Sequence, residues 1–464
     1  MRQTGGEIGS EQACDTSPKR RLLLRIGQVL LILLLCGIAC LLVLRWHWRR
    51  EFRLRIETIR AAGYPATPKE HDAWYAWPQS GANAAHWILG AAAMHQEPPK
   101  EDWERLQRLA FSHGPERPHP AEPLAPDLLN PLEQYIRTND KALESLHEAS
   151  TIEGCRYPMD LSNGLGTLMN HLPEVRKGMS LACLEAILRS EQGDPDGAVR
   201  AVKVAVHAAN SLDSEPVPVS RMVRMSGLIT AGAALERVLN RVELTAEHVE
   251  TLYQAFSGLD AGSGLRRALV GERAMWYPLF DKPQTIDHRL FGRMPPTAML
   301  EAYNALGLTA REGSIYLDFA EERIRIAQLP VSQHLAALEA AQARYLRRRP
   351  AILVSLAGDG FSIMRSETLY VTRLEMVRVS LAVESYRRAQ GGLPETLDQL
   401  VPKDLVAVPE DSYDGMPMRY RRLDRGFIVY SVGDDHKDDG GKREPPRDSR
   451  ASNETWDLVF EVRR

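Results

Sequence analysis

An unbroken apolar segment near the N-terminus limits the folds available to this chain. Residues 26 to 44 read IGQVLLILLLCGIACLLVL, and Gln28 is the one strongly polar side chain among them. At about 1.5 Å rise per residue, a helix of this length just crosses a hydrocarbon core about 30 Å thick. A helix satisfies its own backbone hydrogen bonds, so the segment needs no partner in lipid. The sequence therefore predicts one transmembrane helix at residues 26 to 44.

Basic and aromatic side chains flank both ends of this segment, as is typical of a membrane anchor. They are Lys19, Arg20, Arg21 and Arg25 before it, and Arg45, Trp46, Trp48, Arg49 and Arg50 after it. A cleaved signal peptide is one alternative, but its apolar region is shorter and no small-residue cleavage site follows Leu44. A lipoprotein processed at Cys40 is another. We expect an uncleaved, single-pass anchor, preceded by a basic cytoplasmic tail at residues 1 to 25.

Charge and motif content narrow the classes of function. The formal net charge is −3 and aromatic residues make up 7% of the chain. Such a chain lacks the cationic field and the stacking surface that nucleic-acid binding requires, so nucleic acid is not an expected partner. No HExxH, GxSxG, Walker or dinucleotide-binding glycine pattern occurs. The sequence therefore predicts the lipid bilayer as a partner and does not predict an enzyme.

Residues 45 to 365 predict an α-helical body. Alanine, leucine, arginine and glutamate dominate this part, and alternating β-branched runs are scarce. Residues 93 to 131 form a proline-rich break, because proline inside a helix removes a hydrogen bond. The prolines of this break are Pro98, Pro99, Pro115, Pro118, Pro120, Pro123, Pro126 and Pro131.

A helical hairpin is predicted at residues 181 to 212. Leu184, Ile187 and Leu188 share one face of the first helix, and the turn carries Gly193. The small residues of the second helix permit close packing of the two helices. The hairpin resembles one tetratricopeptide-type repeat, but no clear second copy recurs at a fixed period. A general helical bundle is therefore the preferred interpretation of the body.

The chain changes character at residues 366 to 464. Residues 368 to 390 have the 3.6-residue apolar period of an amphipathic helix, which ends at Gly391. Three extended runs follow at 417 to 423, 427 to 432 and 456 to 462, the first two joined by a short turn. Runs so connected predict a three-stranded antiparallel sheet. The expected fold class is thus mainly α: a transmembrane helix, a helical bundle and a C-terminal α+β module.

This module resembles the C-terminal half of the major pseudopilins of bacterial type II secretion. The matching segments read YRRAQGGLPETLDQLVP, DSYDGMPMRY, IVYSVGDDHKDDGG and WDLVF. The resemblance implies a long helix packed on a small antiparallel sheet. It also implies an acidic loop before the last strand that binds calcium. It covers about the last hundred residues of the chain.

Five aspartates are the candidate calcium ligands. Calcium takes six to eight hard oxygen ligands from carboxylates and backbone carbonyls. By position in the resemblance, Asp435 and Asp457 match family ligands and Asp439 is the expected middle ligand. Asp434 and Asp438 rank below them. The insertion from Lys442 onward is longer than the usual pilin loop, and an unliganded, solvated turn is the alternative.

The chain also departs from pseudopilins. It has no glutamate early in its apolar helix, and about 320 residues separate that helix from the module. We therefore expect not a fibre subunit but a membrane-anchored, non-enzymatic envelope protein with a calcium-stabilised, pilin-like module. Its expected partners are envelope or secretion-system proteins. Calcium is available outside the cytoplasm, so the body is expected on that side of a bacterial inner membrane, although the basic residues after Leu44 favour the reverse. The alternative is a membrane-bound hydrolase that uses acids of the helical body.

Overall fold

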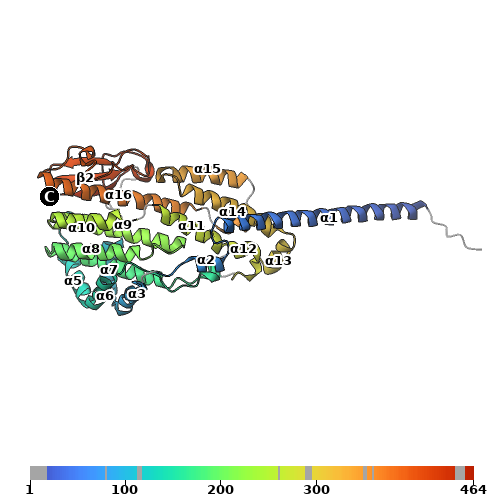
Figure 1. Cartoon of the computed structure of the whole chain (residues 1–464), viewed down its shortest axis with the longest axis horizontal. Coiled ribbons are helices and arrows are strands. Elements are labelled where there is room, and N and C mark those ends of the chain that lie inside the picture. The colour runs from blue at the N-terminus through green and yellow to red at the C-terminus, as the bar shows by residue number, and fades with distance from the viewer. Residues whose placement is uncertain are drawn as a thin grey trace, which may run out of the picture.

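The computed structural model describes residues 18–78, 81–111, 118–259, 262–287, 295–347, 353–357, 360–444 and 455–463. Across these residues the chain forms sixteen α-helices and one three-stranded antiparallel sheet. A long apolar helix comes first, a helical body follows, and the sheet lies near the C-terminus (Figure 1). The predicted fold class, mainly α with a small C-terminal sheet, is confirmed.

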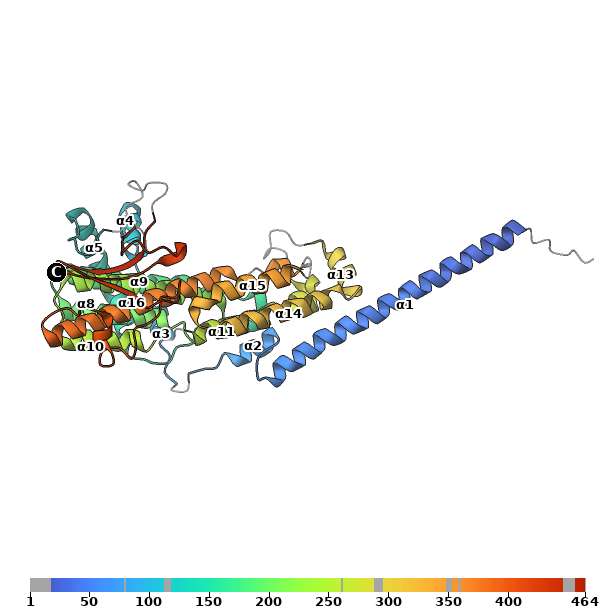
Figure 2. The same ribbon diagram turned by 90° about the horizontal axis from the view of Figure 1, so that it is seen from above.

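The first half of α1 (Pro18–Ala61) extends alone from the body in both ribbon views (Figures 1 and 2). Its apolar side chains between Leu22 and Val43 are exposed on all sides. Among the described helices, this is the one long and apolar enough to cross a membrane, by length and composition. The predicted segment, residues 26 to 44, lies inside it, but the helix does not end there.

The second half of α1 is built into the body. Phe52, Ile56 and Ile59 are buried, at a spacing that places them on one helical face. This face packs on α14 (Leu308–Ile326), where a side chain at Gly313 would come within 2.6 Å of the Phe52 ring. One continuous helix thus joins the exposed apolar segment to the core.

An ion pair on the same contact fixes the rotation of α1. The Arg55 guanidinium donates two hydrogen bonds to the Asp318 carboxylate of α14, at 2.8 and 3.2 Å. A planar, two-bond contact of this kind restricts the orientation of both side chains.

The predicted hairpin is present as α7 (His171–Glu191) and α8 (Pro195–Asn210). Gly193 occupies the turn in the left-handed region, φ 73°. The Asp194 carboxylate caps α8 by accepting a hydrogen bond from the Gly197 amide. Whereas the sequence predicts one buried face, α7 is buried all round between Leu181 and Leu188, because further helices enclose it.

Those enclosing helices come largely from the region that contains the proline-rich break. They are α3 (Ala85–Met94), α4 (Lys100–Phe111), α5 (Pro126–Thr138), α6 (Asp140–Ala149) and α9 (Pro218–Arg241). Pro126 stands in the first turn of α5, where a missing backbone N–H removes no helical hydrogen bond.

The remaining helices extend the body toward α1 and toward the sheet. They are α2 (Pro68–Trp74), α10 (Ala246–Ser257), α11 (Ser263–Met275), α12 (Tyr277–Asp281), α13 (Thr297–Ala305), α15 (His334–Arg347) and α16 (Phe361–Gln390). Helix α16 begins seven residues before the predicted start at 368, and ends as predicted, with Gly391 at φ 74°.

The sheet follows the predicted order, with β2 (Gly426–Ser431) between β1 (Arg419–Leu423) and β3 (Leu458–Val462). Both pairs are antiparallel, and Val429 stands opposite Tyr420 on one side and Phe460 on the other. Side chains on one face of the sheet join the hydrophobic core that also contains α9 and α16 residues. The sheet therefore continues the core of the helical body.

A buried ion pair joins α9 to α16. The Arg221 guanidinium donates to both carboxylate oxygens of Glu367, at 3.1 and 2.6 Å, and both side chains are almost inaccessible to solvent. The ring of Tyr370 lies 5.3 Å from the Arg221 guanidinium carbon. Breaking one partner of such a pair strands the other charge in a medium of low polarity.

We expect Glu367→Gln to lower the free energy of unfolding by about 3 kcal/mol, since it removes the close, two-bond partner of the buried Arg221 charge and leaves Asp213 4.0 Å away. Urea unfolding of the full chain in detergent, followed by circular dichroism, measures this change. The matched control is Glu395→Gln, which removes an exposed ion pair with Arg422 and should cost less than about 1 kcal/mol. Equal effects of the two variants would contradict the structural role of the buried pair.

Candidate functional site

The acidic loop lies on the outer face of the sheet. Gly441 is in the left-handed region, φ 77°, and an added Cβ would collide with the side chain of Ile428 on β2. With Val459, Ile428 and Tyr430 form a small hydrophobic cluster separate from the main core. The loop thus covers apolar side chains that would otherwise face solvent, and glycine is required where it makes this approach.

Two of the five predicted calcium ligands come together beside this glycine. The buried Asp457 carboxylate accepts hydrogen bonds from the Gly441 amide at 2.6 Å and from the Asp439 amide at 3.3 Å. Burial raises the pKa of Asp457, and the charges of Asp438 and Asp439 act in the same direction, although the two backbone hydrogen bonds oppose them. Asp439 accepts from the Thr455 hydroxyl through Oδ1, while its Oδ2 is buried without a hydrogen-bond partner.

The other three predicted ligands point elsewhere. The Asp435 carboxylate accepts from the Lys437 amide, which closes a local turn. Asp438 accepts from its own turn at Gly440 and from Arg419. Asp434, like Asp435 and Asp438, is exposed. In the described part of the chain, no three His, Cys, Asp or Glu side chains are grouped as a metal site would require.

Arg419 on β1 is the positive charge that the acidic segments share. Its guanidinium donates to Asp438 at 3.1 Å, to Asp411 at 3.0 Å and to Asp414 at 2.5 Å. The positive charge of this guanidinium offsets part of the repulsion between the three carboxylates around it. The protein itself therefore supplies a cation for part of this cluster.

Asp411 was not among the predicted site residues, yet it is the most buried acid here, with 0% of its surface exposed. It accepts hydrogen bonds from the Ser431 hydroxyl, the Val432 amide, the Tyr413 amide and Arg419, all between 2.8 and 3.0 Å. The sequence signal is the DSYDG turn, because aspartate often accepts from the amide two residues on. That signal indicates a turn, but not its burial under β2.

A second network joins the free edge of β3 to α9. The Glu461 amide donates to Glu236 at 2.8 Å, and the Glu461 carbonyl accepts from Asn240 at 2.7 Å. The Glu461 carboxylate pairs with Arg443 and with His119, and Arg443 also pairs with Glu236. An open strand edge is a site for unwanted pairing with other chains, and α9 covers this one.

The Glu461 carboxyl group of this network is held as an anion. Although burial opposes ionisation, hydrogen bonds from His119 and Arg463 and the charge of Arg443 lower the pKa of Glu461 from 4.5 to about 2. A carboxyl group with such a pKa cannot donate a proton near neutral pH, as a general acid must. The arrangement fixes the sheet on α9 and does not resemble a proton-transfer site.

A cavity of about 560 Å³ opens behind this network, within the usual size range of ligand pockets. Its walls come from α9, α10, α16, β3 and the segment at residues 118–122. The charged side chains among its lining residues include Glu236, Arg373, Arg443 and Asp457. The predicted ligand Asp457 thus stands between the acidic loop and an internal space that the sequence did not reveal.

We expect Asp411→Asn to weaken the sheet by about 2 kcal/mol, because it removes a charged acceptor from four hydrogen bonds. Hydrogen–deuterium exchange of the β2 amides in the full chain should speed up accordingly. Asp424→Asn, in the exposed β1–β2 turn, keeps the turn chemistry and should leave exchange unchanged. Unchanged exchange in the Asp411 variant would show that Asp411 does not stabilise the sheet.

Comparisons with protein-family models, with curated proteins and with solved structures find no match to this chain. The pseudopilin resemblance of residues 366 to 464 remains a resemblance of sequence segments. Since a fold does not by itself establish a function, function has to be argued from the anchor, the loop and the cavity.

Proposed function

We propose that this protein is a single-pass, membrane-anchored envelope protein that acts by binding, as part of a secretion- or pilus-related assembly in bacteria. The observation that carries the proposal is the continuity of α1. One helix contains the exposed apolar segment at residues 26–44 and the buried face at Phe52, Ile56 and Ile59. A helix without a hinge would hold the body at a fixed distance from the bilayer.

The contact between α1 and α13 supports a body seated on the membrane surface. A Cβ added at Gly307, just after α13, would lie 3.1 Å from the Arg45 Cα, so the two segments are in close contact here. The Arg49 guanidinium donates a hydrogen bond to the Asn304 carbonyl at 3.2 Å. Arg45 directly follows the apolar segment, so these contacts would lie at headgroup depth. Exposed Leu306 suits such a boundary.

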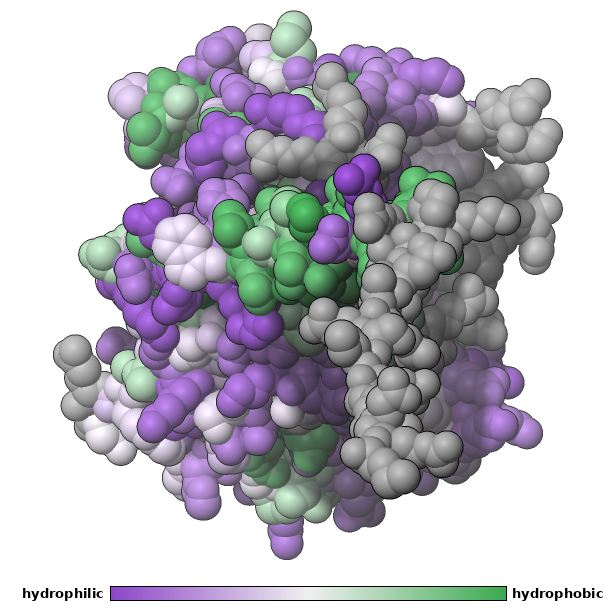
Figure 3. All heavy atoms as spheres, turned by 90° about the vertical axis from the view of Figure 1, so that its right-hand side faces the viewer, coloured by the Kyte–Doolittle hydropathy of each residue, from purple (hydrophilic) through white to green (hydrophobic). Residues whose placement is uncertain are grey.

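The end view agrees with this placement. Figure 3 looks at the end from which α1 projects, so the hydrophobic side chains in the middle of the view include the exposed ones of α1 itself, and hydrophilic side chains surround them. Anchored proteins need such a pattern where an apolar helix enters lipid and the adjoining body meets headgroups.

An inner-membrane location with an exported body is the orientation we favour, with lipid as the first partner. The pseudopilin resemblance and the calcium that it implies argue for export. The basic residues after Leu44 argue against it, because positive charge is enriched on the cytoplasmic side.

Calcium binding by the acidic loop is proposed for the pair Asp439 and Asp457. The partnerless Oδ2 of Asp439 and the repulsion between two adjacent carboxylates would both be relieved by a hard divalent cation. The other three predicted ligands, Asp435, Asp434 and Asp438, are exposed, and we expect them to contribute less to calcium binding.

The alternative, a membrane-bound hydrolase, would need a free acid or base beside a nucleophile. At the cavity between α9, α16 and β3, Glu236 is engaged by Arg443, and Asp457 by backbone amides. The binding role is therefore the better proposal.

Fusions to Arg464 test the location. A reporter that functions only after export should be active, and a reporter that functions only in the cytoplasm should be inactive. The reverse result, with both fusions expressed at equal levels, would place the body in the cytoplasm.

A photo-crosslinking residue tests the binding role in the same cells. Val406 and Leu168 are 93% and 75% exposed and are the most exposed large apolar residues of the described body. Crosslinks from either position should reach envelope proteins, and crosslinks from Asp424 should not. Crosslinks to cytosolic proteins alone would contradict the proposal.

Calcium should raise the unfolding temperature of the sheet relative to chelator, because the ion would bind the folded loop and not the unfolded chain. Thermal unfolding of the full chain in detergent measures the shift. Asp439→Asn should abolish it, whereas Asp435→Asn should leave most of it. Equal unfolding temperatures with calcium and with chelator would contradict the calcium proposal but would not contradict the fold.

A further inference from the structure

Arg373 on α16 is a charged side chain inside the body whose charge has no ionic partner. Its guanidinium donates one hydrogen bond, at 3.0 Å, to the Val459 carbonyl on the free edge of β3. Within the described residues it makes no ion pair, and it lines the cavity of about 560 Å³. Arg373 is half-buried. Charges that are largely removed from water are normally paired, so an unpaired one beside a cavity indicates room for an anion.

Neighbouring charges do not fill this role. Glu236, the acid whose charge raises the pKa of Arg373 most, is already bound to Arg443 and to the Glu461 amide. Glu444 also lines the cavity and raises this pKa by a smaller amount, but it does not form an ion pair with Arg373. Burial lowers the pKa of Arg373, while Glu236 raises it and Arg443 lowers it further. Arginine nevertheless remains charged at any physiological pH, so its charge persists in the cavity.

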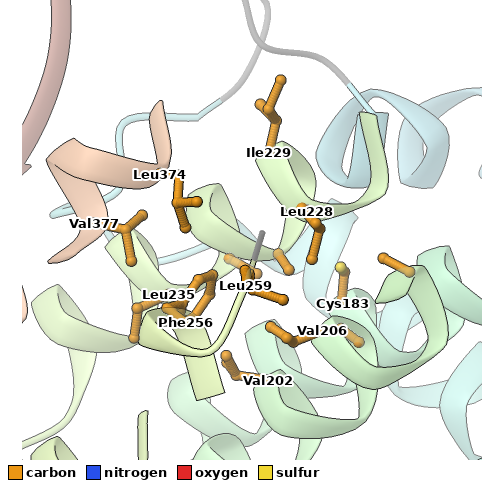
Figure 4. Packing of buried hydrophobic residues seen from close by; sticks show 14 of the residues in the cluster. Cys183, Val202, Val206, Leu228, Ile229, Leu235, Phe256, Leu259, Leu374 and Val377 are labelled. Carbon is orange, nitrogen blue, oxygen red and sulfur yellow. The ribbon is translucent and has the colours of Figure 1, made fainter. Parts of the chain in front are cut away.

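Part of the cavity wall is apolar. Leu374 and Val377 project from α16 on the same side as Phe256 of α10, and Leu228 and Ile229 of α9 lie across from Leu374 (Figure 4). A ligand that fills this space would therefore carry an alkyl or aryl group. Binding pockets for small molecules usually combine such walls with a few polar anchors.

The anion should carry a single charge. The cavity also contains Asp457 and Glu236, which would repel a second negative charge, and its other arginines, Arg237 and Arg443, are already paired. A carboxylate matches the planar fork of a guanidinium and can accept two of its free N–H donors.

We propose that the cavity between α9, α16 and β3 binds an amphipathic monocarboxylate, with its carboxylate on Arg373 and its apolar group against Leu228, Ile229, Leu374 and Val377. This inference does not depend on which side of the membrane the body lies. Saturable monocarboxylate binding would support this inference even if the body proves to lie in the cytoplasm.

Calorimetric titration of the full chain in lipid nanodiscs, with empty nanodiscs subtracted, tests the proposal. Octanoate should bind saturably at one site per chain. Octan-1-ol, which lacks the charge, and acetate, which lacks the apolar chain, should each bind at least ~10-fold more weakly. Equal affinity of octan-1-ol and octanoate would overturn the role of Arg373.

Variants at Arg373 separate charge from structure. Arg373→Gln keeps a donor for the Val459 carbonyl but should lower the affinity for octanoate at least ~10-fold. Arg373→Lys should lower this affinity less, because it keeps the positive charge. Arg421→Gln, on exposed β1, is the matched control and should bind as the unaltered chain does. Undiminished binding by the Arg373→Gln variant would refute the assignment.

A measurement on the unaltered chain avoids any folding defect of the variants. Carbon-13 NMR of carboxyl-labelled octanoate should show the pKa of the bound acid below that of the free acid, because a guanidinium stabilises the carboxylate. A bound pKa at or above the free value would show that the carboxyl group does not meet Arg373.

Discussion

The packing of α16 on α9 is the contact on which most of this structure depends. Gly232 of α9 lets the two helices approach, since an added Cβ would be 3.0 Å from Val377. Arg221 and Glu367 close one end of the contact with a buried ion pair. The sheet then packs on both helices, through core residues such as Phe460 and through the edge contacts of Glu461. If the two helices separated, the sheet would lose its support and the cavity would lose its walls.

The contacts of the individual aspartates explain how the acidic C-terminal segment tolerates so many carboxylates. Arg419 pairs with Asp411, Asp414 and Asp438 together, and backbone amides bind Asp457. These contacts use carboxylates to fasten a loop over the sheet, which hydrogen bonds to charged groups do effectively. A calcium ion would add to this arrangement mainly at Asp439, the one aspartate among the described loop residues with a buried, unpartnered oxygen.

The anchor and the cavity lie at opposite ends of the body. Figure 1 places the sheet and the C-terminus away from the point where α1 leaves the helices. A ligand in the cavity and a lipid surface at α13 would therefore act on separate regions joined by the long helices between them. Under the two proposals, the body would hold one molecule at one end while α1 fixes its other end beside the bilayer.

The sequence by itself determined the local structure: the apolar helix, the α7–α8 hairpin, the end of α16 at Gly391 and the order of the three strands. Each follows from a pattern of neighbouring residues, such as an apolar period, a turn glycine or an alternating run. The pseudopilin resemblance and the closeness of four aspartates in the sequence together gave five candidate ligands, and among these the structure brings Asp439 and Asp457 together. The tertiary structure alone decided that Asp411 is buried, that Arg419 pairs with acids of two segments, and that Arg373 lines a cavity. These depend on contacts between segments far apart in the chain, because burial and pairing are set by what packs against a residue and not by its neighbours in sequence.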